Sequence, residues 1–216
     1  MTIIISIEGN IGSGKSTIVK LLENIYGKSK SICFLDEPVS KWLELKDSNN
    51  KNILNHFYEN IEEYAFPFQM NAYISRLKIL SEALEKGYDM IITERCHQTD
   101  KYVFAKMLYE DNKIKEINYL IYLEWFDYFI KDIPEVHHIY IKTNPNIAYE
   151  RVKKRNRESE NNITLEYLEK CNESHDDWLL PLQKKIIING DFDNNNTDYQ
   201  VNLQVIKNYI ESMIGM

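Results

Sequence analysis

The segment that decides the fold is Gly9-Asn10-Ile11-Gly12-Ser13-Gly14-Lys15-Ser16, which matches the pattern G-x-x-x-x-G-K-[ST]. An apolar, β-branched run at 3–7 precedes this segment and a helical pattern over 14–25 follows it, as the motif requires. Its glycines let successive backbone N–H groups turn inward around phosphate oxygens at a helix N-terminus, where the helix dipole favours anions. The segment therefore predicts a phosphate-binding loop (P-loop).

Four side chains in and near this loop have the chemistry of a phosphoryl-transfer site. Lys15 is expected to reach the β- and γ-phosphates of ATP, and Ser16 to ligate Mg²⁺. Another apolar run, at 90–93, is followed by Glu94, which suits Mg²⁺ or one of its waters, and by Arg95, which suits a phosphoryl group. The chain contains neither D-x-x-G nor N-K-x-D, so the switch and guanine-reading elements of a GTPase are absent.

The composition is close to that of an ordinary soluble globular protein. The 216 residues are 44% hydrophobic and 27% charged, and we expect a single domain over 1–216. Because 26 Lys and Arg stand against 33 Asp and Glu, the net charge of −7 disfavours nucleic acid or an anionic membrane as a partner. The three cysteines lack zinc-ligand spacing, and no apolar run approaches the ~20 residues of a membrane span. Without a leader-like N-terminus, the sequence favours a cytoplasmic protein with reduced thiols.

Short apolar runs alternate with longer helical patterns along the chain, which is typical of βαβ units around a parallel sheet. The runs predict five strands, at 3–7, 32–35, 90–93, 139–141 and 186–188. The helical patterns cover 14–25, 68–86, 98–109, 114–131, 145–156, 164–178 and 200–213, and loops are expected at 47–52 and 189–197. The predicted fold class is α/β: a three-layer P-loop kinase fold with a five-stranded parallel sheet flanked by helices.

A second acidic residue, Glu37, follows the second predicted strand. Ligands of parallel sheets bind at the C-terminal ends of the strands, so Glu37 is a candidate general base. A hydroxyl group must lose a proton as it attacks phosphorus, whereas a nucleotide monophosphate is already ionised and would be repelled by a carboxylate. Glu37 therefore favours an alcohol as the phosphate acceptor.

One stripe of a predicted helix suits a buried ligand, because Gln69, Ala72, Tyr73 and Arg76 are spaced at i, i+3, i+4 and i+7. A glutamine amide offers a donor and an acceptor side by side, which matches the Watson–Crick edge of adenine or cytosine. The same spacing is also compatible with a solvated helix face.

Three further residues bear on the recognition of a base. Phe68 and Phe104 offer aromatic faces on which a base can stack. Asp100 is placed to pair with Arg76 inside the cleft, where the charged pair would meet the methyl group of thymine. Cytosine and the purines carry no such methyl group, so the sequence favours deoxyadenosine, deoxyguanosine or deoxycytidine over thymidine.

Arginines cluster where the predicted helix 145–156 ends, at Arg151, Arg155 and Arg157. Cations are common at helix C-termini in any protein, so the cluster alone is ambiguous. Taken with the P-loop, it predicts a lid at about 151–163 whose arginines neutralise the phosphoryl group during transfer.

These residues together resemble the deoxycytidine/deoxyguanosine kinase family of deoxyribonucleoside kinases, from Ile5 to about Phe192. The family pattern is met by Gly9–Thr17, Glu37-Pro38-Val39 with Trp42, Phe57-Tyr58-Glu59, Phe68-Gln69, Ser75-Arg76, Glu94-Arg95 with Asp100, the arginines of the lid, and 165–168 through 178–180. Cys96 departs from the pattern, because the family usually has serine there.

The resemblance implies roles for individual residues. By it, Glu37 is the base on the sugar 5′-OH, Tyr58 and Glu160 hold the 3′-OH, Gln69 reads the base, and Trp42 belongs to the nucleoside site.

The resemblance also implies an ATP site and a quaternary structure. Thr17 belongs to the P-loop, Asp191 and Phe192 would lie at the adenine of ATP, and Arg151 would stack on its other side. The family resemblance further suggests a homodimer. The predicted helix 114–131 supports this expectation, because its aromatic residues supply more apolar surface than one sheet face needs: Tyr119, Tyr122, Trp125, Phe126 and Phe129.

The sequence thus predicts a kinase that transfers the γ-phosphate of ATP to the 5′-OH of a deoxyribonucleoside, with Mg²⁺. One alternative is a nucleoside monophosphate kinase, which would need extra arginines around the acceptor and would tolerate loss of Glu37. Another is a regulatory module that binds ATP without deoxynucleoside-dependent release of ADP.

Overall fold

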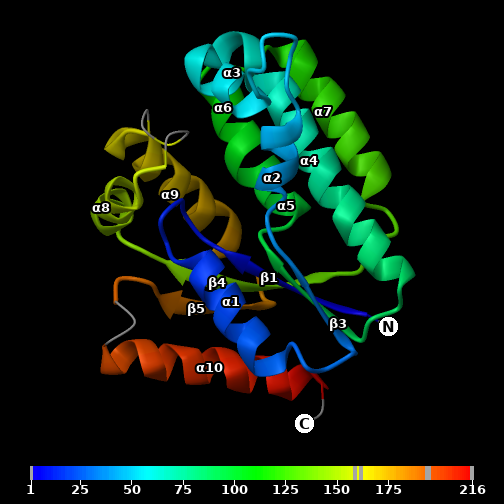
Figure 1. Cartoon of the computed structure of the whole chain (residues 1–216), viewed down its shortest axis with the longest axis vertical. Helices are drawn as coiled ribbons and strands as arrows, with labels where there is room; N and C mark the ends of the chain where they lie inside the picture. The colour runs from blue at the N-terminus through cyan, green and yellow to red at the C-terminus, as the bar shows by residue number, and fades with distance from the viewer. Residues whose placement is uncertain (1, 158–159, 161–162, 193–195, 215–216) are drawn as a thin grey trace.

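The fold is built on a five-stranded parallel sheet (Figure 1). The computed structural model describes residues 2–157, 160, 163–192 and 196–214. Its strands follow the order β2-β3-β1-β4-β5, with the following bounds: β1 Ile3–Glu8, β2 Ile32–Leu35, β3 Met90–Glu94, β4 Val136–Lys142 and β5 Lys185–Asn189. All five predicted strands and the predicted parallel sheet are confirmed. Because every strand runs in the same direction, the segments that follow β1, β2 and β3 meet at one edge.

Alternation along β1 divides the core between the two faces of the sheet. Ile5 and Ile7 pack with α1 (Lys15–Tyr26) and α10 (Thr197–Ile214) on one face. Ile4 packs on the other face with residues of α4 (Ile61–Glu85) and α9 (Leu165–Leu179). This period of two also places Ser6 and Glu8 on the α4 and α9 side.

Two short helices between β2 and α4 are absent from the sequence-based prediction. They are α2 (Val39–Glu44) and α3 (Ile53–Glu59), which pack with α4 around Trp42, Phe57 and Phe68. The predicted start of α4 at residue 68 is also wrong, because the helix begins at Ile61 and passes through Pro67. The Asn60 side chain accepts a hydrogen bond from the N–H of Glu63 and caps this early start.

The helix predicted over 98–109 is present as an unbroken helical segment over 97–110, and its middle part is π-helical. The segment consists of α5 (His97–Thr99), a π-helical turn η1 (Asp100–Ala105) and α6 (Lys106–Glu110). A π-helical turn has more residues per turn than an α-helix and is common at functional sites. Here it carries both Asp100 and Phe104 on the side that faces the cavity described below.

The remaining helices are α7 (Glu116–Phe129) and α8 (Pro145–Arg155). Figure 1 shows α8 and α9 on the opposite side of the P-loop from the group formed by α2, α3, α4, α6 and α7. The predicted lid at 151–163 includes residues 158–159 and 161–162, which lie outside the described residues. All three cysteines are free thiols. Within the described parts of the chain, no helix is long and apolar enough to cross a membrane.

Candidate active site

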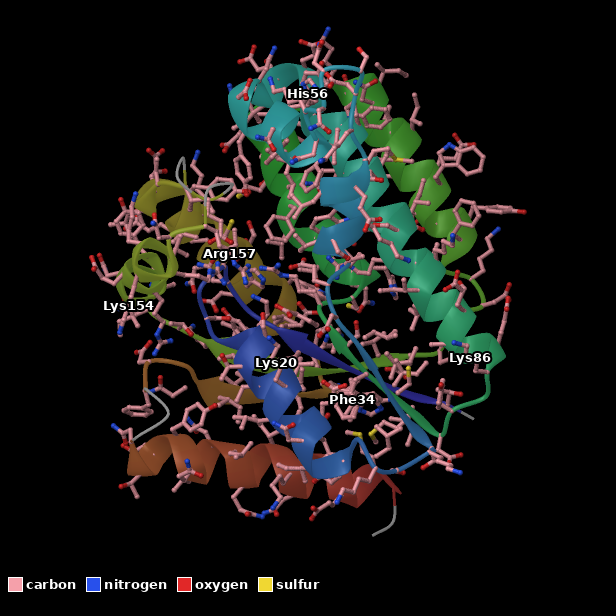
Figure 2. The ribbon with its side chains drawn as sticks, viewed as in Figure 1. Lys20, Phe34, His56, Lys86, Lys154 and Arg157 are labelled. Carbon is pink, nitrogen blue, oxygen red and sulfur yellow. The ribbon has the colours of Figure 1, made fainter. Side chains whose placement is uncertain are left out.

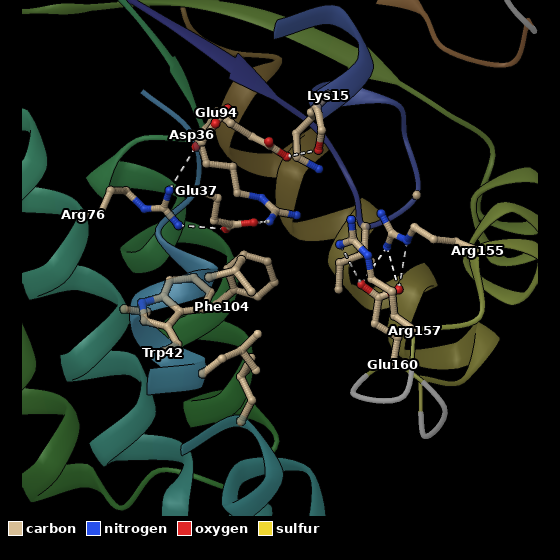
Figure 3. A pocket seen from close by; sticks show the side chains of 18 of the residues that line it. Lys15, Asp36, Glu37, Trp42, Arg76, Glu94, Phe104, Arg155, Arg157 and Glu160 are labelled. Carbon is tan, nitrogen blue, oxygen red and sulfur yellow. Dashed lines mark hydrogen bonds and ion pairs between the residues drawn. The ribbon is translucent and has the colours of Figure 1, made fainter. Parts of the chain in front are cut away.

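A cavity of about 1060 Å³ lies where the P-loop, the ends of β2 and β3, and helices α2, α3 and α4 meet α8 and α9 (Figure 3). The predicted site residues that line this cavity are Ile11, Gly12, Gly14, Lys15, Ser16, Thr17, Glu37, Trp42, Tyr58, Phe68, Gln69, Ala72, Arg76, Glu94, Arg95, Asp100, Phe104, Arg151, Arg155, Arg157 and Glu160. Five predicted residues lie outside the lining: Gly9, Asn10, Ser13, Asp191 and Phe192. The fold therefore brings together most of a site that is scattered over the sequence.

The P-loop is shaped for close approach by an anion. Gly14 has φ +94° and no heavy atom within 4 Å of where a Cβ would be, so the backbone faces open space there. Gly12 also has positive φ, and a Cβ there would collide with the carbonyl oxygen of Ala148. Helix α9 holds the loop in place, because the side-chain amide of Asn10 donates to the Leu168 carbonyl at 2.7 Å. Ser13 Oγ is buried without a hydrogen-bond partner among the described residues.

Lys15 is the first residue of α1, at the end of the loop, and its Nζ donates to the carbonyl oxygen of Asn10 at 2.7 Å. Burial and the charge of Arg95 lower the pKa of Lys15 to about 7, although nearby carboxylates, first Glu94 and then Glu37, act in the opposite direction. A polyphosphate beside Lys15 would favour the ammonium form. The loop is therefore suited to an anionic ligand that supplies the missing negative charge.

Two oxygen ligands meet beside the P-loop. Ser16 Oγ donates a hydrogen bond to Glu94 Oε1 at 2.8 Å. Hydroxyl and carboxylate oxygens are the donors that Mg²⁺ prefers, so this pair fits the ion expected from the sequence. Asp36, to which the sequence analysis gives no role, also lines the cavity beside them.

Glu37 lies between two arginines (Figure 3). Arg95 Nη1 donates to its Oε1 and Oε2 at 2.9 and 3.1 Å, and Arg76 Nη2 donates to Oε1 at 2.9 Å. Burial by itself would raise the pKa of Glu37, but the charges of Arg95 and Arg76 outweigh burial and hold the pKa at about 2. Glu37 is therefore an ionised carboxylate whose orientation is fixed.

The expected pair of Arg76 and Asp100 is present and buried. Arg76 Nε donates to Asp100 Oδ2 at 3.0 Å, and Arg76 Nη1 donates to the Glu94 carbonyl at 3.0 Å. The two side chains are only 3% and 2% exposed, so the Asp100 carboxylate depends on Arg76 for compensation, whereas Arg76 is also paired with Glu37. This arginine connects the wall of the cavity to Glu37.

Aromatic and amide groups form the end of the cavity farther from the P-loop. Trp42 and Phe68 make an edge-to-face contact with 5.4 Å between ring centroids. Trp42 Nε1 donates to Ser75 Oγ at 2.8 Å, and Ser75 in turn donates to the carbonyl of Ala72. Gln69 is buried, and its Oε1 has no partner among the described residues. An unpaired buried amide oxygen suits an incoming N–H donor.

One member of the predicted stripe does not belong to the site. Tyr73 is fully buried in the core, where its ring packs against Phe126 at 5.2 Å and its hydroxyl donates to the Phe126 carbonyl at 3.3 Å. Spacing at i and i+4 places residues near each other, but α4 is covered by α7 on one side and by the cavity on another. Sequence spacing alone does not separate these two environments.

The lid arginines are held by specific partners. Arg155 makes a bidentate contact with Glu160, with N···O distances of 2.6 to 3.1 Å, and Arg157 Nη1 lies 3.5 Å from Glu160 Oε1. Arg151 donates to the carbonyls of Gly190, Asp191 and Phe192 at 2.7, 3.2 and 3.2 Å. Figure 2 shows Arg157 turned toward the cleft and Lys154 at the outer edge of the molecule.

Sequence reasoning missed several residues of the site. Tyr167 on α9 lines the cavity, and burial raises the pKa of its hydroxyl well above the usual range. Leu54 and Asn55 on α3 also line it. The apolar spacing of Ile53, Leu54 and Phe57 after the capping residue Asn52 is a weak signal for α3, but nothing in the sequence indicates that the helix faces the cavity.

Comparison with known proteins identifies the family of the chain. The family model described as deoxynucleoside kinase matches residues 5–214. The chain is 32% identical to deoxycytidine kinase 2 of Gallus gallus, covering 96% of this chain and 90% of the relative. It is 32% identical to mitochondrial deoxyguanosine kinase of Xenopus laevis (81% and 72% covered) and 31% identical to mitochondrial thymidine kinase 2 of Homo sapiens (82% and 64% covered). The chain belongs to the deoxynucleoside kinase family and is an ATP-dependent phosphotransferase.

Proposed function

We propose that the chain phosphorylates the 5′-OH of deoxyadenosine, deoxyguanosine or deoxycytidine in preference to thymidine, with Glu37 as the general base. The observation that carries this proposal is the position of Glu37 in the cavity. Through Arg95 it is tied to the phosphate end, and through Arg76 to the wall near Gln69. A nucleoside whose base lies at Gln69 would direct its 5′-OH toward this carboxylate.

Glu37 would act by orientation as well as by proton transfer. With a pKa held at about 2 it is a weak base, but in a loose phosphoryl-transfer transition state the attacking hydroxyl needs to release its proton only late. A fixed carboxylate that accepts the hydroxyl hydrogen bond selects the attacking conformation throughout the working pH range. Tyr58 and Glu160, which line the same cavity, would bind the sugar 3′-OH.

The phosphate end would neutralise charge on the phosphoryl group. Lys15 and Arg95 are placed for this in the cavity, and Arg155 and Arg157 approach from the lid. Ser16 and Glu94 would hold Mg²⁺, which when bound supplies positive charge to the β- and γ-phosphate oxygens.

The base end would discriminate by size and hydrogen bonding. The Oε1 of Gln69, which has no partner among the described residues, suits the exocyclic amine of cytosine or adenine. The Arg76–Asp100 pair fills the adjacent wall with charged groups, which the methyl group of thymine would have to approach without any compensating contact.

A panel assay tests the proposed function directly. Deoxynucleosides and deoxynucleoside monophosphates are each incubated with ATP and Mg²⁺, and ADP release is measured. We expect release with deoxyadenosine, deoxyguanosine or deoxycytidine, weaker release with thymidine, and none above background with monophosphates. Release that requires a monophosphate would instead support a nucleoside monophosphate kinase. Tight ATP binding without acceptor-dependent release would support a regulatory module.

The lid makes a separate prediction. Arg155→Lys keeps the charge but replaces a planar fork by a single ammonium group, so we expect kcat to fall by roughly 10-fold or more. Lys154→Ala on the outer side of the same helix is the matched control and should leave kcat unchanged. If Arg155→Lys retains full turnover in steady-state assays, Arg155 serves only to bind Glu160 and has no role in transfer.

The apolar surface of α7 supports the proposal of a homodimer, with two of the residues that the sequence suggests, Trp125 and Phe129, exposed on it. Tyr122 and Phe126 are fully buried in the core, so they contribute nothing to an interface. Besides Trp125 and Phe129, the exposed apolar residues of α7 are Ile117, Leu120, Ile121 and Tyr128. An apolar face of this extent is typical of a subunit interface.

Light scattering at micromolar concentration should therefore give about twice the chain mass of 25.7 kDa. Leu120→Glu on the exposed face is expected to produce monomers, whereas Val201→Glu, an equally exposed position on α10, should not. A wild-type mass near 25.7 kDa would contradict the proposed homodimer.

A further inference from the structure

A buried carboxylate that the proposed mechanism does not use lies at the end of β1. Glu8 is fully buried and takes part in no ion pair among the described residues. Its Oε1 accepts hydrogen bonds from Ser6 Oγ at 2.5 Å and from the Cys96 N–H at 3.1 Å, and its Oε2 accepts one from Thr99 Oγ1 at 2.7 Å. Three donors from two segments therefore converge on one anionic side chain.

Two of these donors, the Cys96 N–H and the Thr99 hydroxyl, belong to the turn that follows β3. Arg95 is the first residue of this turn and has φ +60°, in the left-handed region that is unfavourable for residues with a side chain. Such a conformation persists only where the surroundings fix it. The Arg95 N–H donates to the Ile7 carbonyl at 3.1 Å, and Thr93 Oγ1 donates to the Arg95 carbonyl at 2.8 Å. The next N–H along the chain, that of Cys96, donates to Glu8.

This turn determines where the Arg95 side chain points. The guanidinium donates to Glu37, lies 5.1 Å from the centroid of the Phe104 ring, and approaches the Gly9 carbonyl with Nη2 at 3.4 Å. Glu8 and Gly9 are adjacent in the chain. The same short segment therefore binds the backbone after Arg95, through the Glu8 carboxylate, and the guanidinium of Arg95, through the Gly9 carbonyl. A change of the turn would move the guanidinium relative to the P-loop.

We propose that Glu8 is a positioning residue that holds the left-handed turn at Arg95 by accepting the Cys96 N–H and the Thr99 hydroxyl, and so aims the Arg95 guanidinium at the phosphoryl group. This inference rests on the proposed role of Arg95 in transfer. It assigns to Glu8 no contact with either substrate, because Glu8 lies outside the lining of the cavity.

The same cluster also contains two other groups that bind metals in proteins. The thiol of Cys96 and the ring of His138 are buried, and each places a ligand atom within 4.8 Å of the carboxylate. Metal binding would require a deprotonated thiol, but burial and the charge of Glu8 raise the pKa of Cys96 well above its usual value. The Glu8 oxygens already accept three hydrogen bonds, so we assign the cluster to hydrogen bonding.

A double-mutant cycle tests the proposal. Glu8→Gln keeps the side-chain shape but retains only one acceptor oxygen for three donors, so we expect kcat to fall by roughly 10-fold while the KM values for ATP and deoxycytidine change by less than about 2-fold. In an Arg95→Ala background, where the guanidinium is absent, Glu8→Gln should change kcat by less than about 2-fold. Transfer of radiolabelled phosphate keeps the slow variants measurable.

Two further variants complete the test. Glu8→Met removes every acceptor and should lower kcat more than Glu8→Gln does. Ile210→Ala, at a buried position of α10 in the core, is the control for lost stability and should lower the melting temperature without lowering kcat.

An equal loss of kcat from Glu8→Gln with and without Arg95 would show a general structural role and overturn the inference. Unchanged kcat in Glu8→Gln, together with a large loss in Arg95→Ala, would overturn it while leaving the proposed function intact. Unchanged kcat in Arg95→Ala would instead refute the proposed role of Arg95 itself.

Discussion

Glu37→Gln is expected to lower kcat by about 100-fold or more, because the amide keeps the size and one hydrogen-bond acceptor of the carboxylate but cannot take the proton of the 5′-OH. The substitution also leaves the guanidinium groups of Arg76 and Arg95 facing a neutral group. Steady-state ADP release with saturating ATP and deoxycytidine measures the effect. Glu44→Gln, an exposed residue on α2, is the matched control and should retain full activity.

The pH dependence adds a second test of the same role. The arginines hold the pKa of Glu37 at about 2, below its ordinary value of 4.5, so the carboxylate is ionised at all working pH values and loses its charge only as the pH approaches 2. We therefore expect Glu37→Gln to lower kcat/KM by the same factor from about pH 5 to pH 8. Near-normal turnover would remove Glu37 from the mechanism and favour the monophosphate kinase. If the loss of kcat/KM caused by Glu37→Gln becomes smaller as the pH falls toward 5, Glu37 titrates in that range.

The combination of Arg76→Met with Asp100→Ala is expected to raise thymidine kcat/KM relative to deoxycytidine kcat/KM by roughly 5- to 150-fold, the range that about 1–3 kcal/mol of lost discrimination covers. Both changes are needed, because Arg76→Met alone leaves the buried Asp100 carboxylate without its ion-pair partner, and Asp100→Ala alone leaves the charged Arg76 side chain in the wall. The quantity to measure is the ratio of thymidine kcat/KM to deoxycytidine kcat/KM. Arg76 also donates to Glu37, so both absolute rates should fall.

The matched control removes an ion pair from the same helix but away from the cavity. Lys78 and Glu82 lie 3.9 Å apart on the exposed face of α4, and Lys78→Met with Glu82→Ala should leave the substrate ratio unchanged. If thymidine is the best substrate of the unmodified enzyme, the roles assigned to Arg76 and Asp100 are wrong. If Arg76→Met with Asp100→Ala leaves the ratio of thymidine to deoxycytidine kcat/KM unchanged, another part of the cavity wall excludes the methyl group.

Much of the fold was predictable because its signals are local in sequence. The P-loop motif needs only a strand before it and a helix after it, and the apolar runs at all five strands are buried or half-buried for most of their length. Helices α2 and α3 were not predictable in the same way. They are short, and the packing of Trp42 and Phe57 against α4 stabilises them more than their own helical propensity does.

The start of α4 illustrates a conflict between local and tertiary signals. The predicted start at residue 68 directly follows Pro67, a residue type that usually ends or interrupts a helix. The observed helix nevertheless begins at Ile61, where the side chain of Asn60 caps it and buried residues such as Ala65 hold its first turns against α3. Tertiary contacts therefore outweigh the hydrogen bond that the proline lacks.

The sequence by itself determined the family of this protein and indicated the groups proposed to act in its site: the P-loop, the carboxylate Glu37, the arginines, and the pair of Arg76 and Asp100. It did so because each residue type has a fixed chemistry and each lies next to an element that a local pattern predicts. Only the tertiary structure decided that Glu8 binds the turn after Arg95, that Arg155 binds Glu160, and that Tyr73 faces the core. These contacts join segments or faces whose relation depends on the packing of whole helices against the sheet, which no local pattern encodes.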